Sequence, residues 1–350
     1  MAEPKHVQGI DHERVSAWLT TNVEGARGPF TFDLIAGGRS NLTFKVTSSD
    51  GVSFALRRPP ISQVLSTAHD MLREHRVLAA LGSTGVPVPR VFGVCEDESV
   101  NERPFYVMEF VDGMILRSEE VVEALCPPPV RPAIGRHLAS TLAALHRVDP
   151  DEIGLGTLGR KDAYVERQLK RWSTQFDQMV GPDDLHADLV RSVNQQLSAQ
   201  VPDQQAATIV HGDFRLDNTV LDDAGRVKAI LDWELCTLGD PLADLALLMV
   251  YWAEPGDAVV ALEGQSPTLA PGFGTRAEIF EEYERQSDLD LSGLPYYTAF
   301  SYWRLACILQ GVYRRYQEGA SAGDDSSVDA FPEHIGGLAR AAQGILDQPR

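Results

Sequence analysis

The stretch from Ile209 to Asp244 places three oxygen-bearing side chains directly after apolar runs. Asp213 and Asn218 follow the first run and stand five positions apart, and Asp232 follows a second run at 227–231. Short apolar runs bounded by turn residues predict buried strands. We therefore expect two strands to present Asp213, Asn218 and Asp232 at their ends.

These residue types and their spacing fit phosphoryl transfer. That reaction uses a carboxylate to accept the proton of the attacking hydroxyl, and an amide and a second carboxylate to hold magnesium. The separation of Asp213 and Asn218 equals that in the catalytic loop H-R-D-x-x-x-x-N, and Asp232 falls where D-F-G has its metal-binding Asp. Gly212 in place of Arg, and Trp233 in place of Phe, point away from protein kinases. A structural alternative remains for Asp213 alone, because an Asp in such a turn is commonly a capping residue.

The ordered set of motifs resembles one known family. The residues that carry the resemblance are His211-Gly212-Asp213-x-x-x-x-Asn218, then Ile230-Leu231-Asp232-Trp233, then Gly239-Asp240-Pro241-x-x-Asp244-Leu245-Ala246. This set is similar to the aminoglycoside phosphotransferase family of small-molecule kinases. The branch that it resembles most is fused to, or encoded beside, acyl-CoA dehydrogenases. The resemblance runs from Phe32 to Tyr316.

The resemblance implies an α+β, bilobal protein-kinase-like fold. The expected N-terminal lobe, residues 1–110, is a small antiparallel sheet with one helix, and its first 30 residues form a tail and a short helix. The expected C-terminal lobe, residues 111–350, is larger and mainly helical, and it carries the catalytic loop and the acceptor pocket. Nucleotide is expected in the cleft between the lobes.

Periodicity and turn residues predict elements in agreement with this fold. Strands are predicted at Phe30 to Ile35, Asn41 to Thr47, Val52 to Leu56, Val91 to Cys95 and Phe105 to Phe110. Helices are predicted at Asp11 to Leu19, Ser66 to Leu81, Ile134 to His146, Tyr164 to Phe176, Leu185 to Leu197, Leu242 to Trp252, Arg276 to Arg285, Pro295 to Tyr316 and Ile335 to Leu346. Residues 254–274 are predicted to form an exposed loop.

Candidate nucleotide contacts come from the N-terminal part. Gly37, Gly38 and Ser40 lie in a strand-to-strand turn, where backbone amides can approach phosphate oxygens, although Gly-Gly is also an ordinary turn. The P-loop sequence G-x-x-x-x-G-K-[ST] does not occur in the chain. Arg57 stands where kinases have the lysine that contacts the phosphates and pairs with a helical Glu, and Glu74 is the candidate partner. The alternative is that Arg57 belongs to a solvated strand end.

Three further residues have candidate roles. The segment 106–113 resembles the hinge between kinase lobes, in which Glu109 and Val111 would offer main-chain groups to the adenine edge. Read without the family, the segment is a buried strand that ends in a turn. Arg215 could stabilise charge on the transferred phosphate or hold the acceptor, and a salt bridge to a neighbouring carboxylate is equally compatible with the sequence.

Asp240 and Asp244 are assigned to structure. Asp240 precedes a proline and can cap a helix, while Asp244 can brace the catalytic loop. His211 is likewise expected to brace that loop through hydrogen bonds, because the Asp does the chemistry in the kinase arrangement.

The resulting functional hypothesis is Mg²⁺-dependent transfer of the γ-phosphate of ATP, or of GTP, to a hydroxyl of a small molecule. Asp213 would act as the base, and Asn218 and Asp232 would bind the metal. The family resemblance allows two acceptor classes, aminoglycosides and hydroxyacyl-CoA-like metabolites. The alternative hypothesis is a pseudokinase that binds nucleotide or a partner without catalysis, and it is motivated by Arg57 in place of lysine.

Composition narrows the classes of partner. The chain has 350 residues, 43% of them hydrophobic, and a net charge of -19, which argues against binding nucleic acid or anionic membranes. Its four cysteines contain no C-x-x-C pair, so buried free thiols are expected instead of a zinc site. The chain shows neither a membrane span nor a signal peptide, and a cytoplasmic location is expected.

Overall fold

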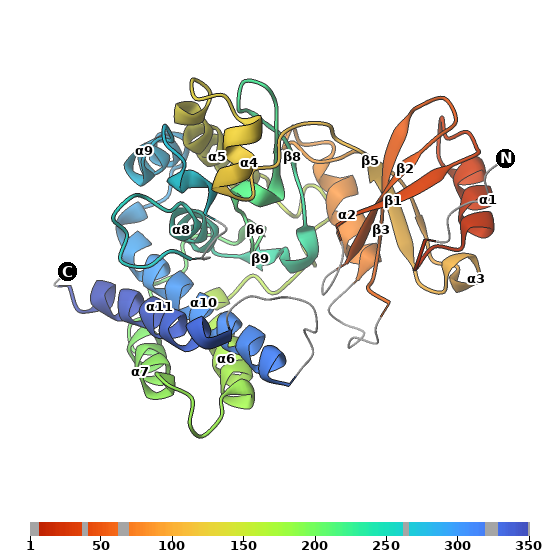
Figure 1. The fold of residues 1–350 in the computed structure, drawn as a ribbon. Helices are drawn as coiled ribbons and strands as arrows, with labels where there is room; N and C mark the ends of the chain where they lie inside the picture. The colour runs from red at the N-terminus through yellow and green to blue at the C-terminus, as the bar shows by residue number, and fades with distance from the viewer. Residues whose placement is uncertain (1–6, 37–40, 62–69, 262–265, 319–327, 349–350) are drawn as a thin grey trace.

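A five-stranded antiparallel sheet forms one end of the molecule (Figure 1). The computed structural model describes residues 7–36, 41–61, 70–261, 266–318 and 328–348. The strand order is β1-β2-β3-β5-β4, with β1 (Thr31–Ala36), β2 (Leu42–Thr47), β3 (Ser53–Arg58), β4 (Val91–Cys95) and β5 (Phe105–Glu109). All five predicted strands are therefore present, and β3 continues to Arg58, two residues beyond the predicted end.

The two faces of this sheet belong to two separate cores. Successive residues of a strand point to opposite faces. Phe54 and Leu56 on β3 pack in a core with Val15 and Leu19 of α1 (His12–Asn22), whose first turn is capped by Asp11. Ala55 belongs instead to the core of the helical part. Arg57 shares the face of Ala55, so β3 presents Arg57 toward the rest of the molecule.

The helix α2 (Met71–Leu81) connects the sheet to the helical part. Its residues Met71 and Leu78 are buried in the core of the helical part, and Arg73 donates to the carbonyl of Leu158, 3.2 Å away. The predicted start of this helix at Ser66 is wrong, because Asp70 is extended and caps the helix with its side chain. Residues 62–69 lie outside the described residues.

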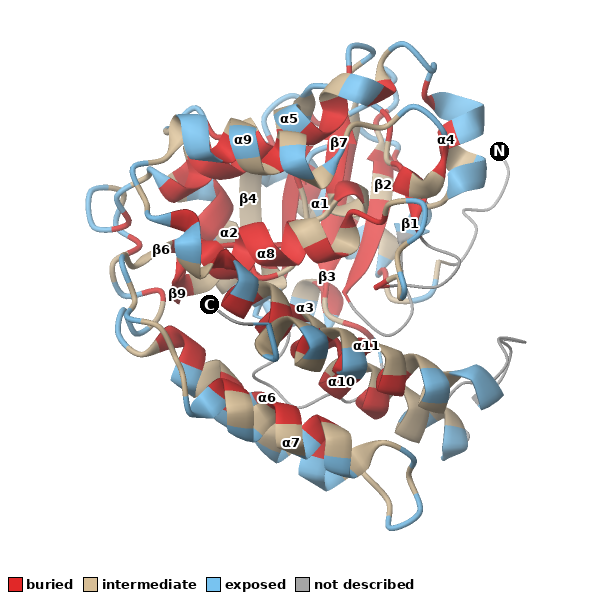
Figure 2. Ribbon diagram, turned by 90° about the vertical axis from the view of Figure 1, so that its left-hand side faces the viewer, coloured by how far each residue is buried: buried red, intermediate tan, exposed pale blue. Residues whose placement is uncertain are grey.

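The helical part carries most of the chain. Its helices are α4 (Glu119–Leu125), α5 (Arg131–His146), α6 (Tyr164–Met179), α7 (Ala187–Ser198), α8 (Pro241–Tyr251), α9 (Arg276–Gln286), α10 (Leu294–Gln317) and α11 (Phe331–Leu346). A short helix, α3 (Glu98–Asn101), lies beside α1 in the sheet part. Figure 2 shows α8 buried almost along its whole length, whereas α7 and α9 expose one face. The short helices α3 and α4 were not predicted from the sequence.

Residues 254–274 were predicted to be an exposed loop, and this prediction is wrong in part. The segment contains a short 3₁₀ turn (Pro267–Leu269), and Ser266, Thr268 and Ala270 are buried. The Thr268 hydroxyl donates to the carbonyl of Ala253 at 2.8 Å. This part of the chain therefore packs beside α4 and against the residues that follow α8.

Two small antiparallel ladders position the central motif. The first pairs β6 (Thr208–Val210) with β9 (Thr237–Gly239), and the second pairs β7 (Thr219–Leu221) with β8 (Val227–Ile230). The turn 211–218 connects β6 to β7, and Asp232 follows β8, as the two apolar runs predicted. The strand β9 was not predicted.

The segment after β5 leads into these ladders. Met114 pairs with Leu221 of β7 as an isolated bridge. A Cβ atom at Gly113 would lie 2.4 Å from the carbonyl oxygen of Leu221, so only glycine permits this approach. No helix among the described residues is long and apolar enough to cross a membrane. The four cysteines are buried free thiols, as predicted.

Candidate active site

The turn between β6 and β7 is held by a buried carboxylate. Asp244 on α8 accepts hydrogen bonds from the backbone N–H groups of His211 (2.6 Å) and Gly212 (2.9 Å). Gly212 has a φ of +84°, and a Cβ atom there would lie 2.9 Å from the carbonyl oxygen of Leu235. The bracing role expected of Asp244 is confirmed, and the glycine is required by both its backbone conformation and its surroundings.

His211 braces the same turn and has no ring nitrogen left for catalysis. Its Nε2 lies 2.9 Å from the carbonyl oxygen of Leu231, and its Nδ1 accepts from the backbone N–H of Asp213 at 3.2 Å. Because the carbonyl can only accept and the N–H can only donate, these bonds define a neutral ring with its proton on Nε2. The ring also packs on Trp233, with centroids 4.7 Å apart.

Buried polar groups on α5 and α9 form a network that reaches Asp244, and a second buried pair joins the start of α8 to α10. His146 lies 3.5 Å from Asp244 and 2.7 Å from the Tyr283 hydroxyl. Burial alone would raise the pKa of Asp244, but its bonds to His146 and the backbone outweigh this effect and lower the pKa. Asp240 caps α8, as predicted, and accepts from the Tyr297 hydroxyl at 2.6 Å. Burial raises the pKa of Asp240.

One oxygen of Asp213 is held by two neighbours. The side-chain amide of Asn218 donates to Oδ2 of Asp213 at 3.0 Å and to its backbone carbonyl at 2.9 Å. Nε of Arg215 lies 3.3 Å from the same Oδ2. Within the described part of the chain, Oδ1 of Asp213 accepts no bond, so this oxygen is available to a bound molecule.

Arg215 forms the salt bridge that the sequence allowed. Besides Asp213, it binds Oδ2 of Asp217 through Nη2 at 3.1 Å, and its guanidinium lies over the Tyr251 ring at 5.0 Å. Burial would lower the pKa of Arg215, but the two carboxylates and Tyr251 raise it. Asp217 was missed in the sequence, although a second carboxylate two positions after Arg215 could have indicated a paired arrangement.

Arg57 on β3 occupies the centre of a second charged cluster. Its Nε lies 2.9 Å from Glu74 on α2, and its Nη2 lies 2.5 Å from Oδ1 of Asp232. The side chain of Arg57 is also 3.4 Å from the Thr43 hydroxyl. Arg57 is only 8% exposed, so the interpretation of a solvated strand end is wrong. The candidate pair of Arg57 and Glu74 is formed.

Glu74 has further partners that the sequence did not indicate. It accepts from the Tyr106 hydroxyl at 3.0 Å and from the Asn41 amide at 2.8 Å, and it is 2% exposed. Burial raises the pKa of Glu74, although Arg57 opposes this shift. For Arg57, burial opposes the charge, but Glu74 and Asp232 outweigh it and raise the pKa. Each charged group of this cluster therefore depends on the other.

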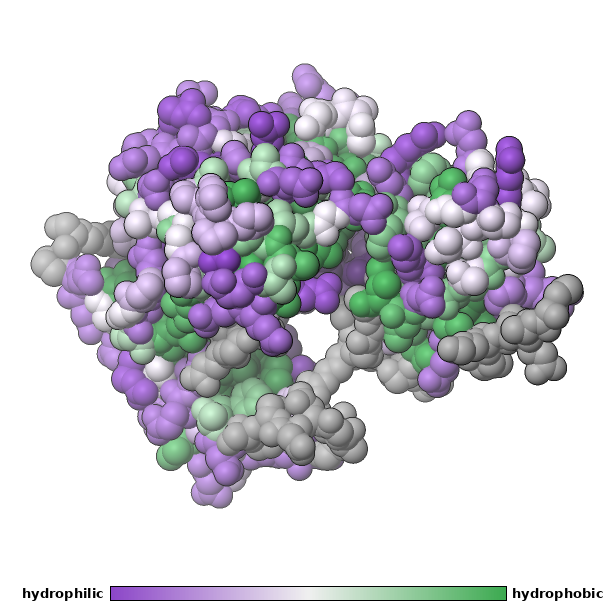
Figure 3. Space-filling view, turned by 45° about the horizontal axis from the view of Figure 1, so that its top comes forward, coloured by the Kyte–Doolittle hydropathy of each residue, from purple (hydrophilic) through white to green (hydrophobic). Residues whose placement is uncertain are grey.

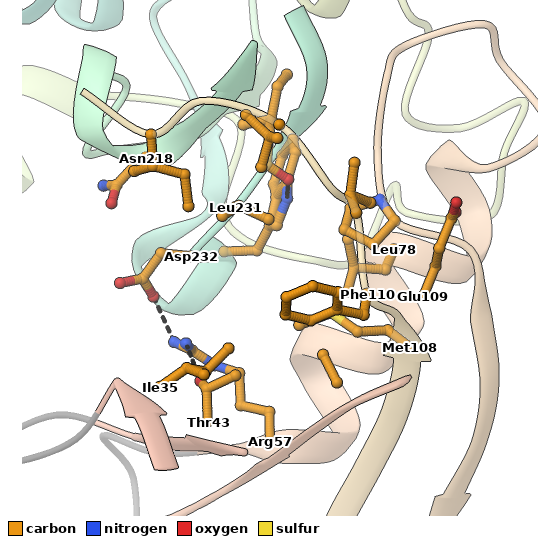
Figure 4. Close-up of a pocket in the computed structure, with 18 of the residues that line it drawn as sticks. Ile35, Thr43, Arg57, Leu78, Met108, Glu109, Phe110, Asn218, Leu231 and Asp232 are labelled. Carbon is orange, nitrogen blue, oxygen red and sulfur yellow. Dashed lines mark hydrogen bonds and ion pairs between the residues drawn. The ribbon is translucent and has the colours of Figure 1, made fainter. Parts of the chain in front are cut away.

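Asn218 and Asp232 extend to the same side of one pocket (Figure 4). Asp232 adopts a left-handed conformation with a φ of +62°, which is uncommon for a residue other than glycine. The backbone N–H of Leu231 donates to the carbonyl of Asn218 at 2.8 Å, which ties the two segments together. The side-chain nitrogen of Asn218 donates to Asp213, so the side-chain oxygen of Asn218 takes no part in these bonds. A carboxylate and an amide oxygen are ligands that suit Mg²⁺, and the two residues fit a metal-binding role.

The pocket is a cavity of about 310 Å³ between the sheet and the helical part. Arg57, Asn218 and Asp232 line its polar end, and the rest of the wall is mostly apolar: Ile35, Ala55, Leu78, Met108, Phe110, Val111, Val220, Ile230 and Leu231. The space-filling view of Figure 3 shows hydrophobic residues on both sides of the notch between the two parts. A cavity with an apolar wall and a few polar groups at one end is typical of a small-molecule site.

The hinge candidates Glu109 and Val111 lie at the wall of this cavity. The Glu109 carboxylate is directed away from Arg57 and the polar end (Figure 4) and accepts from the backbone N–H of Arg90 at 3.3 Å. Any contact from Glu109 to a bound molecule would therefore come from its main chain. Val111 lines the same wall. The glycine-rich candidates Gly37, Gly38 and Ser40 lie outside the described residues.

Comparison with known proteins identifies the family. Residues 31–282 match the family described as "Phosphotransferase enzyme family". The chain is 35% identical over 302 residues to acyl-CoA dehydrogenase family member 10 of Mus musculus, covering 84% of this chain and 27% of that protein. It is 33% identical over 340 residues to family member 11 of Rattus norvegicus, covering 93% of this chain and 42% of that protein. The chain thus spans less than half the length of these curated relatives.

Solved structures share the fold. A Ralstonia eutropha JMP134 protein described as a putative aminoglycoside phosphotransferase superposes with a TM-score of 0.79 at 32% identity, covering 96% of this chain and 98% of that one. A thermostable mutant of aminoglycoside phosphotransferase APH(4)-Ia, in a complex with ADP and hygromycin B, gives a TM-score of 0.61 at 17% identity, covering 93% and 97%. The small antiparallel sheet and the many helices are those of the bilobal protein-kinase-like fold. The chain therefore belongs to the phosphotransferase enzyme family, a family of small-molecule kinases.

Proposed function

We propose that this protein transfers the γ-phosphate of ATP to a hydroxyl group of a small molecule, with Asp213 as the base. The observation that carries the proposal is the convergence of Arg57, Asn218 and Asp232 at the polar end of a single cavity, with Asp213 bonded to Asn218. GTP is a second candidate donor. The proposal includes the predicted boundary between an N-terminal lobe, residues 1–110, and a C-terminal lobe, residues 111–350, with nucleotide in the cleft between them.

The proposed transfer is a single displacement in which every group has a named partner. The acceptor hydroxyl gives its proton to Oδ1 of Asp213, and its oxygen forms a bond to the γ-phosphorus. The bond from that phosphorus to the bridging oxygen breaks, and its electron pair leaves with ADP. Arg57 lies on the nucleotide side of the site, where a guanidinium can bind phosphate oxygens with two parallel hydrogen bonds.

Magnesium would be held by the oxygens of Asn218 and Asp232, and it would neutralise charge on the phosphates. Oδ1 of Asp232 lies against Arg57, so Arg57 positions this carboxylate as well as neutralising it. The bond from Asn218 to Asp213 orients the amide group. These residues place the base and the proposed metal ligands in one connected set.

The charges near Asp213 favour a hydroxyacyl-CoA-like acceptor over an aminoglycoside. An amine-rich acceptor needs unpaired carboxylates, but Asp213 and Asp217 share Arg215. Glu254 and Asp257, at the end of α8, are likewise paired with Arg276. A small second cavity beside Arg215 is lined mostly by apolar or aromatic residues, namely Leu216, Leu248, Tyr251, Trp252 and Pro267. This cavity has a volume of about 20 Å³, enough for a water-sized group, so we place only the hydroxyl end of an uncharged acyl group there.

The relatives support the same acceptor class. The matched proteins of mouse and rat are named as acyl-CoA dehydrogenase family members. A kinase segment within such proteins would have a ready supply of acyl-CoA compounds. We therefore place hydroxyacyl-CoA compounds first and aminoglycosides second.

The experiment that tests the function is a screen for acceptor-dependent release of ADP from ATP or of GDP from GTP. Purified protein is incubated with ATP or GTP, with and without Mg²⁺, and with hydroxyacyl-CoA compounds in one set and aminoglycosides in the other. We expect ADP release that needs both Mg²⁺ and a hydroxyacyl-CoA. Release that occurs only with aminoglycosides would overturn the acceptor assignment, and no release with any acceptor would overturn the transfer.

One observation favours a second function, a nucleotide-binding pseudokinase. The ion pair of 2.5 Å between Arg57 and Asp232 engages a proposed metal ligand directly. Thermal-shift measurements with nucleotide distinguish the two functions. A kinase is expected to gain thermal stability with Mg²⁺ and nucleotide together, whereas nucleotide binding that is indifferent to Mg²⁺ would support the pseudokinase.

A further inference from the structure

We propose that Asp217 is a positioning residue of the transfer reaction, which acts on the base Asp213 through Arg215. The inference rests on the proposed phosphotransferase function and adds a residue to it. Asp217 follows Arg215 by two positions, and Arg215 follows Asp213 by two positions. The three charged groups form a continuous chain in the turn between β6 and β7.

The geometry gives Arg215 one fixed place. Nε of Arg215 contacts Oδ2 of Asp213 at 3.3 Å, and Nη2 contacts Oδ2 of Asp217 at 3.1 Å. The ring of Tyr251 covers one face of the guanidinium, with its centroid 5.0 Å away. All three charged side chains are between 21% and 25% exposed, so they are neither buried in the core nor free in solvent. A planar group contacted on two edges and one face cannot rotate without breaking a contact.

This arrangement determines which oxygen of the base is used. Oδ2 of Asp213 is already bound to Asn218 at 3.0 Å and to Arg215. Oδ1 accepts no bond from the described residues and is therefore the oxygen that receives the hydroxyl proton. If Arg215 moved, only Asn218 would hold Oδ2, and the carboxylate of Asp213 could turn about its Cβ–Cγ bond. Oδ1 would then no longer be fixed toward the hydroxyl.

Asp217 also balances the charge beside the base. Asp213 and Arg215 alone sum to zero, because -1 and +1 cancel, and a guanidinium without a second partner would bind the base more tightly. With Asp217 the three groups sum to -1, so Arg215 is shared between two carboxylates. Sharing holds the base in place while its negative charge remains available to the hydroxyl.

The location of Asp217 agrees with this role. Asp217 lines the large cavity together with Asn218 and Asp232, and it lines the small cavity together with Arg215 and Tyr251. It therefore stands at the wall between the proposed nucleotide site and the proposed acceptor site. Asp217 therefore lies beside the path that the phosphate follows in the proposed transfer, where a shift of the base affects the reaction.

The test compares Asp217→Asn, Asp217→Glu, Arg215→Gln and the double variant Arg215→Gln/Asp217→Asn in the ADP-release assay. We expect Asp217→Asn to lower kcat about ten-fold with the KM for nucleotide within two-fold, because misplacement of a reacting group affects the chemical step. Asp217→Glu is expected to recover part of the loss. The matched control is Asp223→Asn, which removes an exposed carboxylate in the turn between β7 and β8 and is expected to leave kcat unchanged.

The double variant separates action through Arg215 from independent action. If Asp217 acts through Arg215, the double variant has the kcat of Arg215→Gln within about two-fold, since residues that act as one unit are not additive. The Mg²⁺ concentration for half-maximal rate then stays unchanged in Asp217→Asn. Multiplicative losses, or a raised Mg²⁺ requirement, would overturn the inference and make Asp217 a metal-side residue.

Failure of the inference is distinguishable from failure of the proposed function. An active wild type with an Asp217→Asn variant of equal kcat overturns the inference alone. A wild type that releases no ADP with Mg²⁺ and any acceptor overturns the proposed function, and the inference falls with it. Thermal unfolding of each variant shows whether a loss of kcat comes from misfolding. If Asp217→Asn is misfolded, the kcat of the conservative variant Asp217→Glu decides the inference.

Discussion

Two arginines organise the site in opposite ways. Arg57 gathers Glu74 and Asp232, and Asp232 is 175 positions away in the chain. Arg215 gathers Asp213 and Asp217, each two positions away. The first cluster therefore exists only when the sheet and the helical part are assembled, whereas the second can form within one turn.

The two clusters differ in how strongly they link folding stability to activity. Removing a member of the Arg57 cluster leaves a buried charge without its partner at the junction of two parts of the molecule, which is costly. Removing a member of the Arg215 cluster changes a partly exposed turn, where ion pairs contribute little to stability. We therefore expect the first cluster to affect both folding and activity, and the second to affect mainly activity.

Among the variants that leave the base Asp213 intact, Asp232→Asn is expected to lose the most activity. It removes a proposed metal ligand that is also a partner of Arg57. We expect kcat for transfer to fall about 10²–10³-fold, as for loss of one preorganised electrostatic contact, and the Mg²⁺ requirement to rise. Steady-state kinetics over a range of Mg²⁺ concentrations measure both. A kcat within three-fold of wild type would refute the metal role.

Arg57→Ala tests the long-range cluster through stability. The substitution leaves Glu74 buried without its cation, and we expect a loss of about 3 kcal/mol in the free energy of unfolding. The matched control is Arg58→Ala on the same strand. Arg58 is also buried, but it donates to the backbone carbonyls of Gly9 and Pro59. Denaturant unfolding of both variants checks the prediction, and equal losses would show that the carboxylates are not the cause.

Asp244→Asn extends the comparison to the support of the turn. The pKa of Asp244 is lowered in the folded protein, so its charge contributes stability above the unfolded value near 4, and this contribution is lost as the pH falls through the folded value. We expect the variant to be about 2–3 kcal/mol less stable at pH 7. The difference should shrink below pH 4 in urea titrations at several pH values. A difference that stays constant down to pH 2 would contradict the assignment.

Gly212→Ala tests whether the turn needs space as well as a positive φ. Gly51 serves as the control because its φ is +86°, close to the +84° of Gly212, and no atom lies within 4 Å of a Cβ built there. Both substitutions share the conformational cost. We expect Gly212→Ala to lose about 1–2 kcal/mol more, owing to the clash with Leu235. Equal thermal unfolding temperatures for the two variants would refute the steric requirement.

The smallest expected effect is that of Glu109→Ala. Its carboxylate is directed away from the polar end of the pocket and accepts from the backbone N–H of Arg90. If Glu109 contributes through its main chain, nucleotide affinity should change by less than about two-fold, because exposed ion pairs and hydrogen bonds of a side chain contribute little. Isothermal titration with ATP measures this. A ten-fold weaker affinity would assign the side chain a direct role.

The sequence predicted those features of the site that depend on local order. The apolar runs predicted that Asp213, Asn218 and Asp232 lie in turns at strand ends, and the order of β3 and α2 indicated the pair of Arg57 and Glu74. The catalytic and metal-binding roles of the first three residues stay predictions. The bracing by Asp244 was also expected from its place in the motif set, although it lies 33 and 32 positions from the two backbone N–H groups that donate to it. The five strands of the sheet were predicted, since each alternates or is bounded by turn residues.

The features that the sequence did not predict depend on register and on short segments. Tyr106 reaches Glu74 because β5 pairs with β3 in the register Arg57 opposite Tyr106, and register is not readable from one strand alone. Asn41 meets Glu74 for a similar long-range reason. The three-residue strand β9 is too short to show a period. Burial of Thr268 follows from packing beside α4 and from its bond to the carbonyl of Ala253, which composition does not reveal.

The proposed transfer depends most directly on Asp213 as the base, and one substitution tests this role. ADP release with Mg²⁺, ATP and a hydroxyacyl-CoA acceptor is measured for wild type and Asp213→Asn, together with nucleotide affinity by isothermal titration. We predict a loss of about 10³-fold in kcat, the size of general-base catalysis, with nucleotide affinity unchanged within about three-fold. An Asp213→Asn variant that transfers phosphate at the wild-type rate would contradict the account.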